Sequence, residues 1–600
     1  MPGPHRRGPA SERARDFKGT LKHLVIYLAH ERIPLVIALV CAVASVVFNV
    51  VGPRILGQAT TKLFEGVAAK VMGTGSIDFA GIGYILAGLL CLYVTSAAFN
   101  FCQGWLMTGV TQRVCYRMRR EIVEKIDRMP LSYFESNAVG DVLSRITNDV
   151  DTVGQSLNQC VTQLITSTTQ LVGVTVMMLS VSLPLAGLTF LTVPVSLVLV
   201  VLVVRVSQRY FRQQQALLGR VDGIIEESFS GQNVIKVFNR EQRAVADFDG
   251  DNDLLFQAGW RSQFLSGLMQ PIMNLVANLA YVAVVSFGAF LAISGAITVG
   301  DIQAFMQYVR NFTQPITQLT QVSNMLQMLS AAAERVFEFL DSEEETPDAV
   351  TPELPARERG AVQFEHVRFG YVPDKTIIHD FSCDIQPGQT VAIVGPTGAG
   401  KTTLMKLLMR FYDVGAGSIR VDGVDVRDCA RDDLRANFAM VLQDTWLFKG
   451  SVRENIRYGR EGASDDEVCA AARAALADHF IRTLPGGYDF ELNEDASNVS
   501  QGQKQLLTIA RAFIADRPIL ILDEATSNVD TRTEERIQRA MDALMQGRTS
   551  FVIAHRLSTI RNADVILVLR DGDIVESGTH DELLARGGFY AELYNSQFEE

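Results

Sequence analysis

The 600-residue sequence is poor in charged residues, and this deficit constrains its class. Only 20% of its positions are Asp, Glu, Lys or Arg, whereas soluble domains average about 25%. The mean hydropathy is +0.14. This composition excludes a disordered chain, which lacks enough apolar surface to bury, and it indicates that part of the chain lies in a bilayer. The net charge of −12 argues against a dedicated nucleic-acid-binding protein but does not exclude a local basic patch.

Cysteine motifs and a secretory signal are also lacking. The eight cysteines include no pair with C-x-x-C spacing, and several lie inside apolar runs. We therefore expect neither a disulfide framework nor a zinc site, and we interpret the cysteines as small apolar packing residues. No short apolar stretch with a cleavage site follows the basic N-terminus, so residues 1–31 are expected to form a flexible cytoplasmic tail and a short elbow.

Long apolar runs, by contrast, fill the first half of the chain. Because a helix needs about 20 mostly apolar residues to cross ~30 Å of hydrocarbon, each run predicts a membrane-spanning helix. The runs occupy residues 33–57, 81–108, 157–181, 183–206, 264–293 and 299–325. Asp301, Arg310 and several Gln and Asn residues interrupt the last run, and such a polar helix is expected only where one face lines a cavity or another helix.

Basic residues mark one side of these runs. Lys and Arg are frequent in the N-terminal tail and after the second and fourth runs, whereas the turns at 181–184 and 293–296 carry none. The positive-inside rule therefore places both termini in the cytoplasm. Two cytoplasmic connections, 109–156 and 207–263, are longer than a crossing requires. Each is either a simple helical projection or a docking contact for a domain below the membrane.

The composition changes after residue 340. An acidic, Pro-bearing stretch is typical of a linker over 341–360. From 361 to 600, short β-branched runs alternate with helical stretches, which is typical of a soluble α/β domain. We therefore expect a helical transmembrane domain over 32–340, with two intracellular loops, followed by this α/β domain.

The strongest motif follows the predicted strand 390–394. It reads Gly395-Pro396-Thr397-Gly398-Ala399-Gly400-Lys401-Thr402 and precedes a helix-like run over 403–411 that starts at Thr403. Glycines let backbone N–H groups wrap a phosphate, while the lysine reaches the β- and γ-phosphates and the threonine hydroxyl binds Mg²⁺. These residues therefore predict a nucleotide-binding site.

An acidic pair follows a second buried-strand run. Residues 519–522 are apolar, and Asp523 and Glu524 come directly after them. Alone, such a pair is usually a solvated strand end. With a phosphate loop in the same domain, Asp523 is interpreted as a holder of Mg²⁺ and Glu524 as the residue that polarises the attacking water.

With these motifs, the domain resembles the nucleotide-binding domain of ABC transporters, and the whole chain resembles an ABC exporter half-transporter. The resemblance is closest to one subunit of heterodimeric bacterial multidrug exporters. It implies six membrane helices, an α/β P-loop ATPase domain, and ATP and Mg²⁺ as cofactors. Residues 130–145 look like the first intracellular loop of that family and residues 227–238 like the second, whose short helices press on the nucleotide-binding domains.

The resemblance also implies roles for single residues. Tyr371 matches the aromatic residue that stacks on adenine, and Gln443 matches the glutamine that contacts Mg²⁺ or water. His555 matches the switch histidine, which with Glu524 and Gln443 completes the catalytic set. The expected ATP contacts further include the signature sequence and the dimer-contact loop, through Ser500, Gln501, Gly502, Gln503 and Asp530.

The signature departs from the family pattern. It reads V-S-Q-G-Q, so Gln501 stands where the family usually has glycine. A glycine that approaches a phosphate closely cannot be replaced without moving backbone or adding bulk. In this family the signature of each chain faces the phosphate loop of the partner. The glutamine at 501 therefore affects the ATP site that contains the partner's phosphate loop, not the site that contains Lys401. This favours a heterodimer over a homodimer that tolerates glutamine. The other chain would have an intact signature and a degenerate Walker B motif, the acidic pair that Asp523 and Glu524 form in this chain.

The sequence therefore predicts ATP-driven export of hydrophobic or amphipathic compounds of the multidrug type by alternating access. The expected partners are a second half-transporter, membrane lipid and a small hydrophobic substrate, but no nucleic acid. The alternative is a homodimeric lipid flippase of the same fold. Methionine and aromatic residues of the membrane helices either line an adaptable apolar pocket or face lipid and neighbouring helices: Met177, Met178, Phe305, Met306, Tyr308, Phe312, Met325 and Met328.

Overall fold

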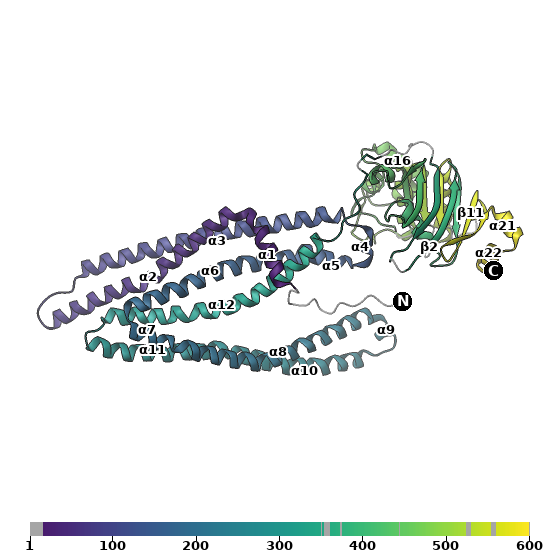
Figure 1. Cartoon of the computed structure of the whole chain (residues 1–600). Coiled ribbons are helices and arrows are strands. Elements are labelled where there is room, and N and C mark those ends of the chain that lie inside the picture. The colour runs from purple at the N-terminus through teal and green to yellow at the C-terminus, as the bar shows by residue number, and fades with distance from the viewer. Residues whose placement is uncertain are drawn as a thin grey trace. The chain divides into compact units, whose positions relative to one another are not determined.

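The computed structural model describes residues 16–349, 351–352, 360–372, 375–442, 445–523, 530–553 and 560–598. The chain divides into two compact units (Figure 1). The helical unit comprises Met1–Asp127 and Val139–Ser342. The α/β unit comprises Glu343–Glu600 together with the short segment Arg128–Ala138, which is inserted between two parts of the helical unit in the sequence.

The helical unit is built from helices of very different lengths, of which the longest form because the sequence is apolar over whole membrane-spanning lengths. They are α1 (Phe17–Leu28), α2 (Arg32–Val71), α3 (Phe79–Ile126), α5 (Val139–Ser144), α6 (Val150–Val181), α7 (Leu183–Phe190), α8 (Thr192–Ser230), α9 (Gln232–Val237), α10 (Glu241–Gly267), α11 (Met269–Ile293) and α12 (Val299–Leu340). A 3-10 turn, η1 (Ala29–Glu31), joins α1 to α2, and a π-helix, η2 (Arg145–Asp149), joins α5 to α6.

Four continuous helical stretches among the described residues are long and apolar enough to cross a membrane: Phe17–Val71, Phe79–Ile126, Val139–Val181 and Glu241–Ile293. They contain the first, second, third and fifth predicted runs. The fourth run is divided between α7 and α8, and the sixth forms the first part of α12.

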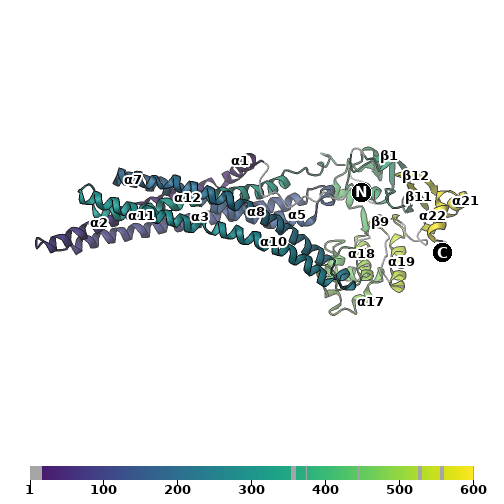
Figure 2. The same cartoon turned by 90° about the horizontal axis from the view of Figure 1, so that it is seen from below.

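The helices of this unit pack in two groups. In the first group, α2 packs against α3, α6 and α12, and α6 packs closely against α12. In the second group, α8 and α10 run side by side and α9 joins their ends (Figures 1 and 2). Helix α11 connects the groups because it contacts both α8 and α12. The α8–α10 pair is therefore a long helical hairpin with α9 at its tip.

An ion pair ties the end of α12 to the π-helix. The Arg335 Nε donates to the Asp149 Oδ2 at 2.9 Å, and a second guanidinium nitrogen contacts the other carboxylate oxygen. Asp149 is only 5% exposed. A π-helix is rare and marks a local irregularity of the helix. Here the buried pair fixes that irregular turn to α12.

The α/β unit is built on two main sheets. The six-stranded sheet has the order β12-β11-β3-β10-β9-β6, and the four-stranded sheet has the order β2-β1-β4-β5. The strands are β1 (Val362–Phe369), β2 (Ile378–Ile385), β3 (Thr390–Val394), β4 (Ala416–Val421), β5 (Val424–Asp425), β6 (Phe438–Val441), β9 (Ile519–Asp523), β10 (Thr549–Ile553), β11 (Val565–Arg570) and β12 (Asp573–Gly578). Two short strands, β7 (Gly450–Ser451) and β8 (Glu491–Leu492), pair with each other.

Short helices surround these sheets. They are α4 (Leu131–Ser136), α13 (Lys401–Leu408), α14 (Arg431–Arg435), α15 (Val452–Arg457), α16 (Asp465–Ala474), α17 (Asp478–Ile481), α18 (Gln501–Ala515), α19 (Thr531–Met545), α21 (His580–Arg586) and α22 (Phe589–Phe598), with a 3-10 turn η3 (Gly487–Asp489). The helix predicted over 403–411 begins earlier, at Lys401, and ends at Leu408. It does not continue to residue 411 because Arg410 adopts a left-handed conformation with φ +51°.

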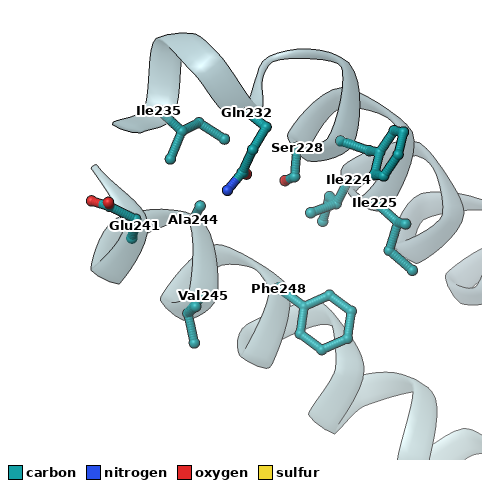
Figure 3. Close-up of a pocket in the computed structure, with 10 residues that line it drawn as sticks. Ile224, Ile225, Ser228, Gln232, Ile235, Glu241, Ala244, Val245 and Phe248 are labelled. Atoms are coloured by element: carbon teal, nitrogen blue, oxygen red, sulfur yellow. The ribbon is translucent and has the colours of Figure 1, made fainter. Parts of the chain in front are cut away.

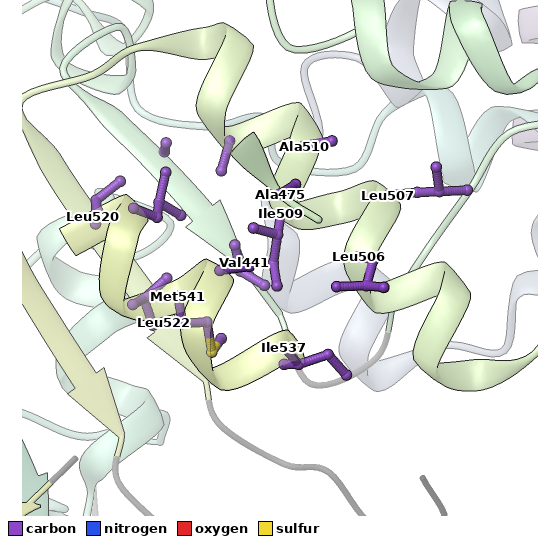
Figure 4. Close-up of a cluster of buried hydrophobic side chains, with 14 of the residues drawn as sticks. Val441, Ala475, Leu506, Leu507, Ile509, Ala510, Leu520, Leu522, Ile537 and Met541 are labelled. Carbon is purple, nitrogen blue, oxygen red and sulfur yellow. The ribbon is translucent and has the colours of Figure 1, made fainter. Parts of the chain in front are cut away.

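Apolar side chains of α18 and α19 hold the six-stranded sheet in place. Ile509 of α18, Ile537 of α19 and the strand residues Leu520 and Leu522 are almost fully buried in one cluster (Figure 4). Burial of each such side chain contributes about 1.5–3 kcal/mol. The cluster therefore fixes the start of α18, which carries the predicted signature, relative to the end of β9, which carries Asp523.

Candidate nucleotide-binding site

Three parallel strands bring the nucleotide motifs to one edge of the sheet. Strand β10 lies between β3 and β9, and its residue Ile553 is in register with Ile393 of β3 and with Asp523 of β9. Parallel strands that end at the same level send their following loops out of the same edge. The phosphate loop after β3 and the acidic residue at the end of β9 therefore lie at one site.

The glycines of the phosphate loop meet two separate steric requirements. A Cβ atom on Gly395 would lie 2.3 Å from the carbonyl oxygen of Leu569, so only glycine fits beside β11. Gly400 has φ +100° and caps α13, which begins at Lys401. Side chains disfavour this left-handed conformation. The loop thus leads directly into a helix N-terminus, whose free N–H groups favour an anion.

Lys401 lies across the loop. Its Nζ donates to the carbonyl oxygens of Gly395 at 2.7 Å and of Pro396 at 3.1 Å. Burial lowers the pKa of the Lys401 ammonium, and the nearby Asp523 carboxylate opposes this effect. The structure therefore places the lysine of the phosphate loop near the aspartate that ends β9.

This donor set fits a magnesium nucleotide. Backbone N–H groups and a lysine ammonium suit phosphate oxygens, and a hydroxyl together with a carboxylate suits Mg²⁺. Thr402, in the first turn of α13, would supply the hydroxyl, and Asp523, at the end of β9, would supply the carboxylate. ATP bound here would place its phosphates on the loop, and the metal would neutralise their charge.

Tyr371 lies beside the phosphate-loop helix. The residue is 40% exposed, and its hydroxyl is 3.2 Å from the Thr403 Oγ1 of α13. The Lys406 Nζ lies 5.6 Å from the centre of the ring, and the Tyr412 ring packs edge-on against it at 5.0 Å. An exposed aromatic ring next to the phosphate loop is compatible with stacking on adenine, and this role stays a prediction.

Glu135 links its own helix, α4, to α13, the helix that follows the phosphate loop. Its carboxylate accepts hydrogen bonds from the Lys406 Nζ at 2.6 Å and from the Tyr412 hydroxyl at 2.7 Å. Burial acts to raise the pKa of Glu135, but these two hydrogen bonds and the lysine charge outweigh it, so the pKa is lowered. Sequence reasoning placed Glu135 in the first intracellular loop but missed Lys406 and Tyr412, which belong to no motif.

The signature segment begins helix α18. Ser500 is its N-cap, and the Ser500 Oγ accepts from the Gln503 N–H at 3.3 Å while the Gln503 side chain accepts from the Ser500 N–H at 2.9 Å. Gly502 is buried in the first turn. The Gln501 side chain is directed toward Thr445, because its Nε2 donates a hydrogen bond to the Thr445 Oγ1 at 3.2 Å. The residue that replaces glycine is thus held by a specific contact.

The remaining predicted residues have different outcomes. Asp530 is the N-cap of α19, where its Oδ1 accepts from the Thr533 N–H at 2.9 Å. The backbone hydrogen bond from Thr533 lowers the pKa of Asp530. Gln443, Glu524 and His555 lie outside the described residues. Their catalytic and metal-binding roles stay predictions.

Comparison with known proteins identifies the family. The profile described as ABC transporter transmembrane region matches residues 35–316, and the profile described as ABC transporter matches residues 378–527. The chain is 46% identical to the fatty acid ABC transporter ATP-binding/permease protein of Mycobacterium tuberculosis, covering 98% of this chain and 97% of that protein. It is 36% identical to the ATP-dependent lipid A-core flippase of Syntrophus aciditrophicus, covering 86% of each.

A solved structure has the same fold. A bacterial Atm1-family ABC exporter with ATP bound superimposes with a TM-score of 0.71 and 30% identity, covering 92% of this chain and 98% of that one. Fold and site together define a membrane transporter with a fused ATPase domain. The chain belongs to the ABC transporters, as an exporter half-transporter that binds ATP with Mg²⁺ and couples its hydrolysis to transport.

Proposed function

We propose that this chain exports hydrophobic or amphipathic compounds, and within that class acyl lipids, across the cytoplasmic membrane. The names of the fatty acid transporter and the lipid A-core flippase support a substrate with an acyl chain. Drug-like compounds of the multidrug type share that amphipathic chemistry and form the broader alternative. The domain boundaries and the cytoplasmic position of both termini belong to this proposal.

The observation that carries the proposal is the contact between α4 and the phosphate-loop helix. Glu135 is held by Lys406, one turn after Thr402 and Thr403 in α13. A change in α13 when the site fills would therefore act directly on α4, which continues in sequence into α5 and the membrane helices. This is the connection that a pump requires between an ATP site and a transport path.

A second contact surface indicates the partner. At the tip of the α8–α10 hairpin, Phe229, Val237 and Phe238 are 84%, 75% and 68% exposed. Beside them, a cavity of about 400 Å³ lies between α8, α9 and α10 and is lined mainly by apolar residues such as Ile224 and Phe248 (Figure 3). Apolar surface of this kind marks an interaction site. The proposed occupant is the nucleotide-binding domain of a second half-transporter.

Gln501 supports a heterodimer. Its side chain and its contact with Thr445 occupy a position where the family usually has glycine. The proposed partner has an intact signature and a degenerate Walker B motif, so that one ATP site hydrolyses and the other mainly binds. In the hydrolysing site, this chain supplies Lys401 and Asp523 together with Glu524, His555 and Gln443.

Purification of the chain alone and with its candidate partner tests the assembly. The heterodimer predicts that transport-coupled ATPase activity requires both chains. A stable homodimer with robust substrate-stimulated ATPase activity would contradict the heterodimer. Substrate class is tested on the active complex with a panel of acyl lipids and drugs, and stimulation by drugs alone would contradict the acyl-lipid proposal.

A further inference from the structure

Two polar stripes face one cavity between α11 and α12. On α11, Gln270, Asn274 and Asn278 follow one another at four-residue intervals, which places them on one helix face. On α12, Arg310, Gln314 and Gln318 have the same spacing. All of these residues line a cavity of about 600 Å³, a size that accommodates a drug-sized ligand. Met273 and Ala277 give the cavity an apolar wall.

Counted from the start of α12, Arg310 falls near the middle of a membrane-spanning length. Arg310 follows the first residue of α12, Val299, by 11 positions, which corresponds to about 17 Å along a helix that rises ~1.5 Å per residue. Half the hydrocarbon thickness is about 15 Å. From Arg310 the polar face continues to Gln321, toward the end of α12 that leads to the linker.

Arg310 is the single charged residue of this region of the sequence. Residues 262–300 contain no Asp, Glu, Lys or Arg, and between Asp301 and Glu334 only Arg310 is charged. Its guanidinium lies 5.4 Å from the centre of the Tyr281 ring. Among the described residues, no carboxylate lies within ion-pair distance of it. A charge at this depth is costly unless it faces a cavity and meets an opposite charge.

The surrounding amides are held in place. The Gln318 Oε1 accepts from the buried Ser167 Oγ of α6 at 2.8 Å, and the Gln270 Nε2 donates to the Asn274 Oδ1 at 3.2 Å. Amide side chains offer donors and acceptors but no charge. The cavity thus provides one cation, several neutral hydrogen-bonding groups and an apolar wall, which together complement an amphiphile with one negative charge.

We infer that this cavity binds the carboxylate head group of a long-chain acyl substrate, with Arg310 as its counter-ion and the amide stripes as its hydrogen-bonding partners. A planar guanidinium binds a carboxylate through two parallel hydrogen bonds. The Tyr281 ring holds the guanidinium from one face through a cation–π contact. The inference rests on the proposed function and names the head group that the substrate carries.

The test uses amphiphiles that share a sixteen-carbon chain and differ in their heads. Palmitate, hexadecanol, hexadecyl phosphate and hexadecyltrimethylammonium are titrated into the full-length transporter, reconstituted with its partner in nanodiscs, and ATPase stimulation is measured. We expect palmitate to reach half-maximal stimulation at a concentration about tenfold below that of hexadecanol, as one charge-assisted contact would give. Arg310→Gln should remove this preference, and Arg310→Lys should restore part of it.

Arg261 provides a matched control for Arg310. Arg261 also lies over a tyrosine ring, that of Tyr210 at 5.8 Å, but outside the cavity, so Arg261→Gln should keep the preference for palmitate. Equal responses to palmitate and hexadecanol, or a preference that persists in a folded Arg310→Gln variant, overturn the head-group site alone. An Arg310-dependent preference for hexadecyl phosphate overturns the carboxylate assignment. No response to any of the four amphiphiles overturns the proposed function as well.

Discussion

Glu135 and Lys406 are 271 residues apart in the sequence, yet the lysine Nζ lies 2.6 Å from the Glu135 carboxylate. Glu135 belongs to α4, and Lys406 belongs to the helix that the phosphate loop caps. Lys406 also lies over the Tyr371 ring, the predicted adenine contact. A short path of side chains therefore joins the nucleotide site to the segment that interrupts the membrane helices.

Removal of the Glu135 carboxylate should weaken coupling. Glu135→Ala loses two hydrogen bonds of a partly exposed carboxylate, each contributing about 1 kcal/mol. We expect substrate stimulation of ATPase activity to fall several-fold while basal activity stays close to that of the wild type. Glu535→Gln, which alters an exposed α19 carboxylate paired with Arg539, is the control. Unchanged stimulation in Glu135→Ala would remove α4 from the coupling path.

The contact of α4 with α13 through Glu135 should weaken at acidic pH. The pKa of Glu135 is lower in the folded protein than its ordinary value of about 4.3, so the carboxylate stabilises the docked state above that value. This stabilisation is lost as the pH falls through the lowered folded pKa. Hydrogen exchange of residues 131–136, corrected for the intrinsic pH dependence of exchange, should show protection falling in that window. Protection in Glu135→Gln should not change there, and identical pH profiles of the two proteins would contradict the assignment.

Restoration of the signature glycine should tighten ATP binding at the second site. In a heterodimer, Gln501→Gly is expected to lower the Kd of that site for ATP severalfold, because a glycine lets the backbone approach a phosphate. The ATPase rate should stay unchanged, because the acidic pair of the partner is degenerate in that site. Thr445→Val removes the partner of the Gln501 side chain but keeps the glutamine, and should not tighten binding. Weaker ATP binding in Gln501→Gly, or an equal gain in Thr445→Val, would contradict the steric account.

The buried pair between Asp149 and Arg335 should contribute strongly to the stability of the helical unit. Asp149→Asn leaves a partly buried guanidinium without its counter-ion, which we expect to cost about 2 kcal/mol and to lower the Tm by several degrees. Glu124→Gln, which alters the exposed pair with Arg120, should shift the Tm little. Thermal denaturation in nanodiscs measures both variants, and equal shifts would show that the pair is no stronger than a surface contact.

Motifs with fixed spacing could be predicted from the sequence. Apolar runs indicated most membrane helices, and the strands that carry the phosphate loop and Asp523 follow from β-branched runs between turn signals. Contacts across long separations could not be predicted, because no local pattern links Glu135 to Lys406 or Gln501 to Thr445. The same is true of the π-helix, which no residue pattern specifies. The polar interruptions of the last run predicted a helix with one face toward a cavity or another helix, but the matching stripe on α11 emerges only when both helices are seen together.

Transport by the reconstituted complex tests the central claim most directly. Inside-out vesicles that contain this chain and its partner should accumulate radiolabelled palmitate when ATP and Mg²⁺ are added, and Glu524→Gln should bind ATP but accumulate no palmitate. Accumulation without ATP, equal accumulation in Glu524→Gln, or no accumulation of any amphiphile by the active ATPase would contradict the account.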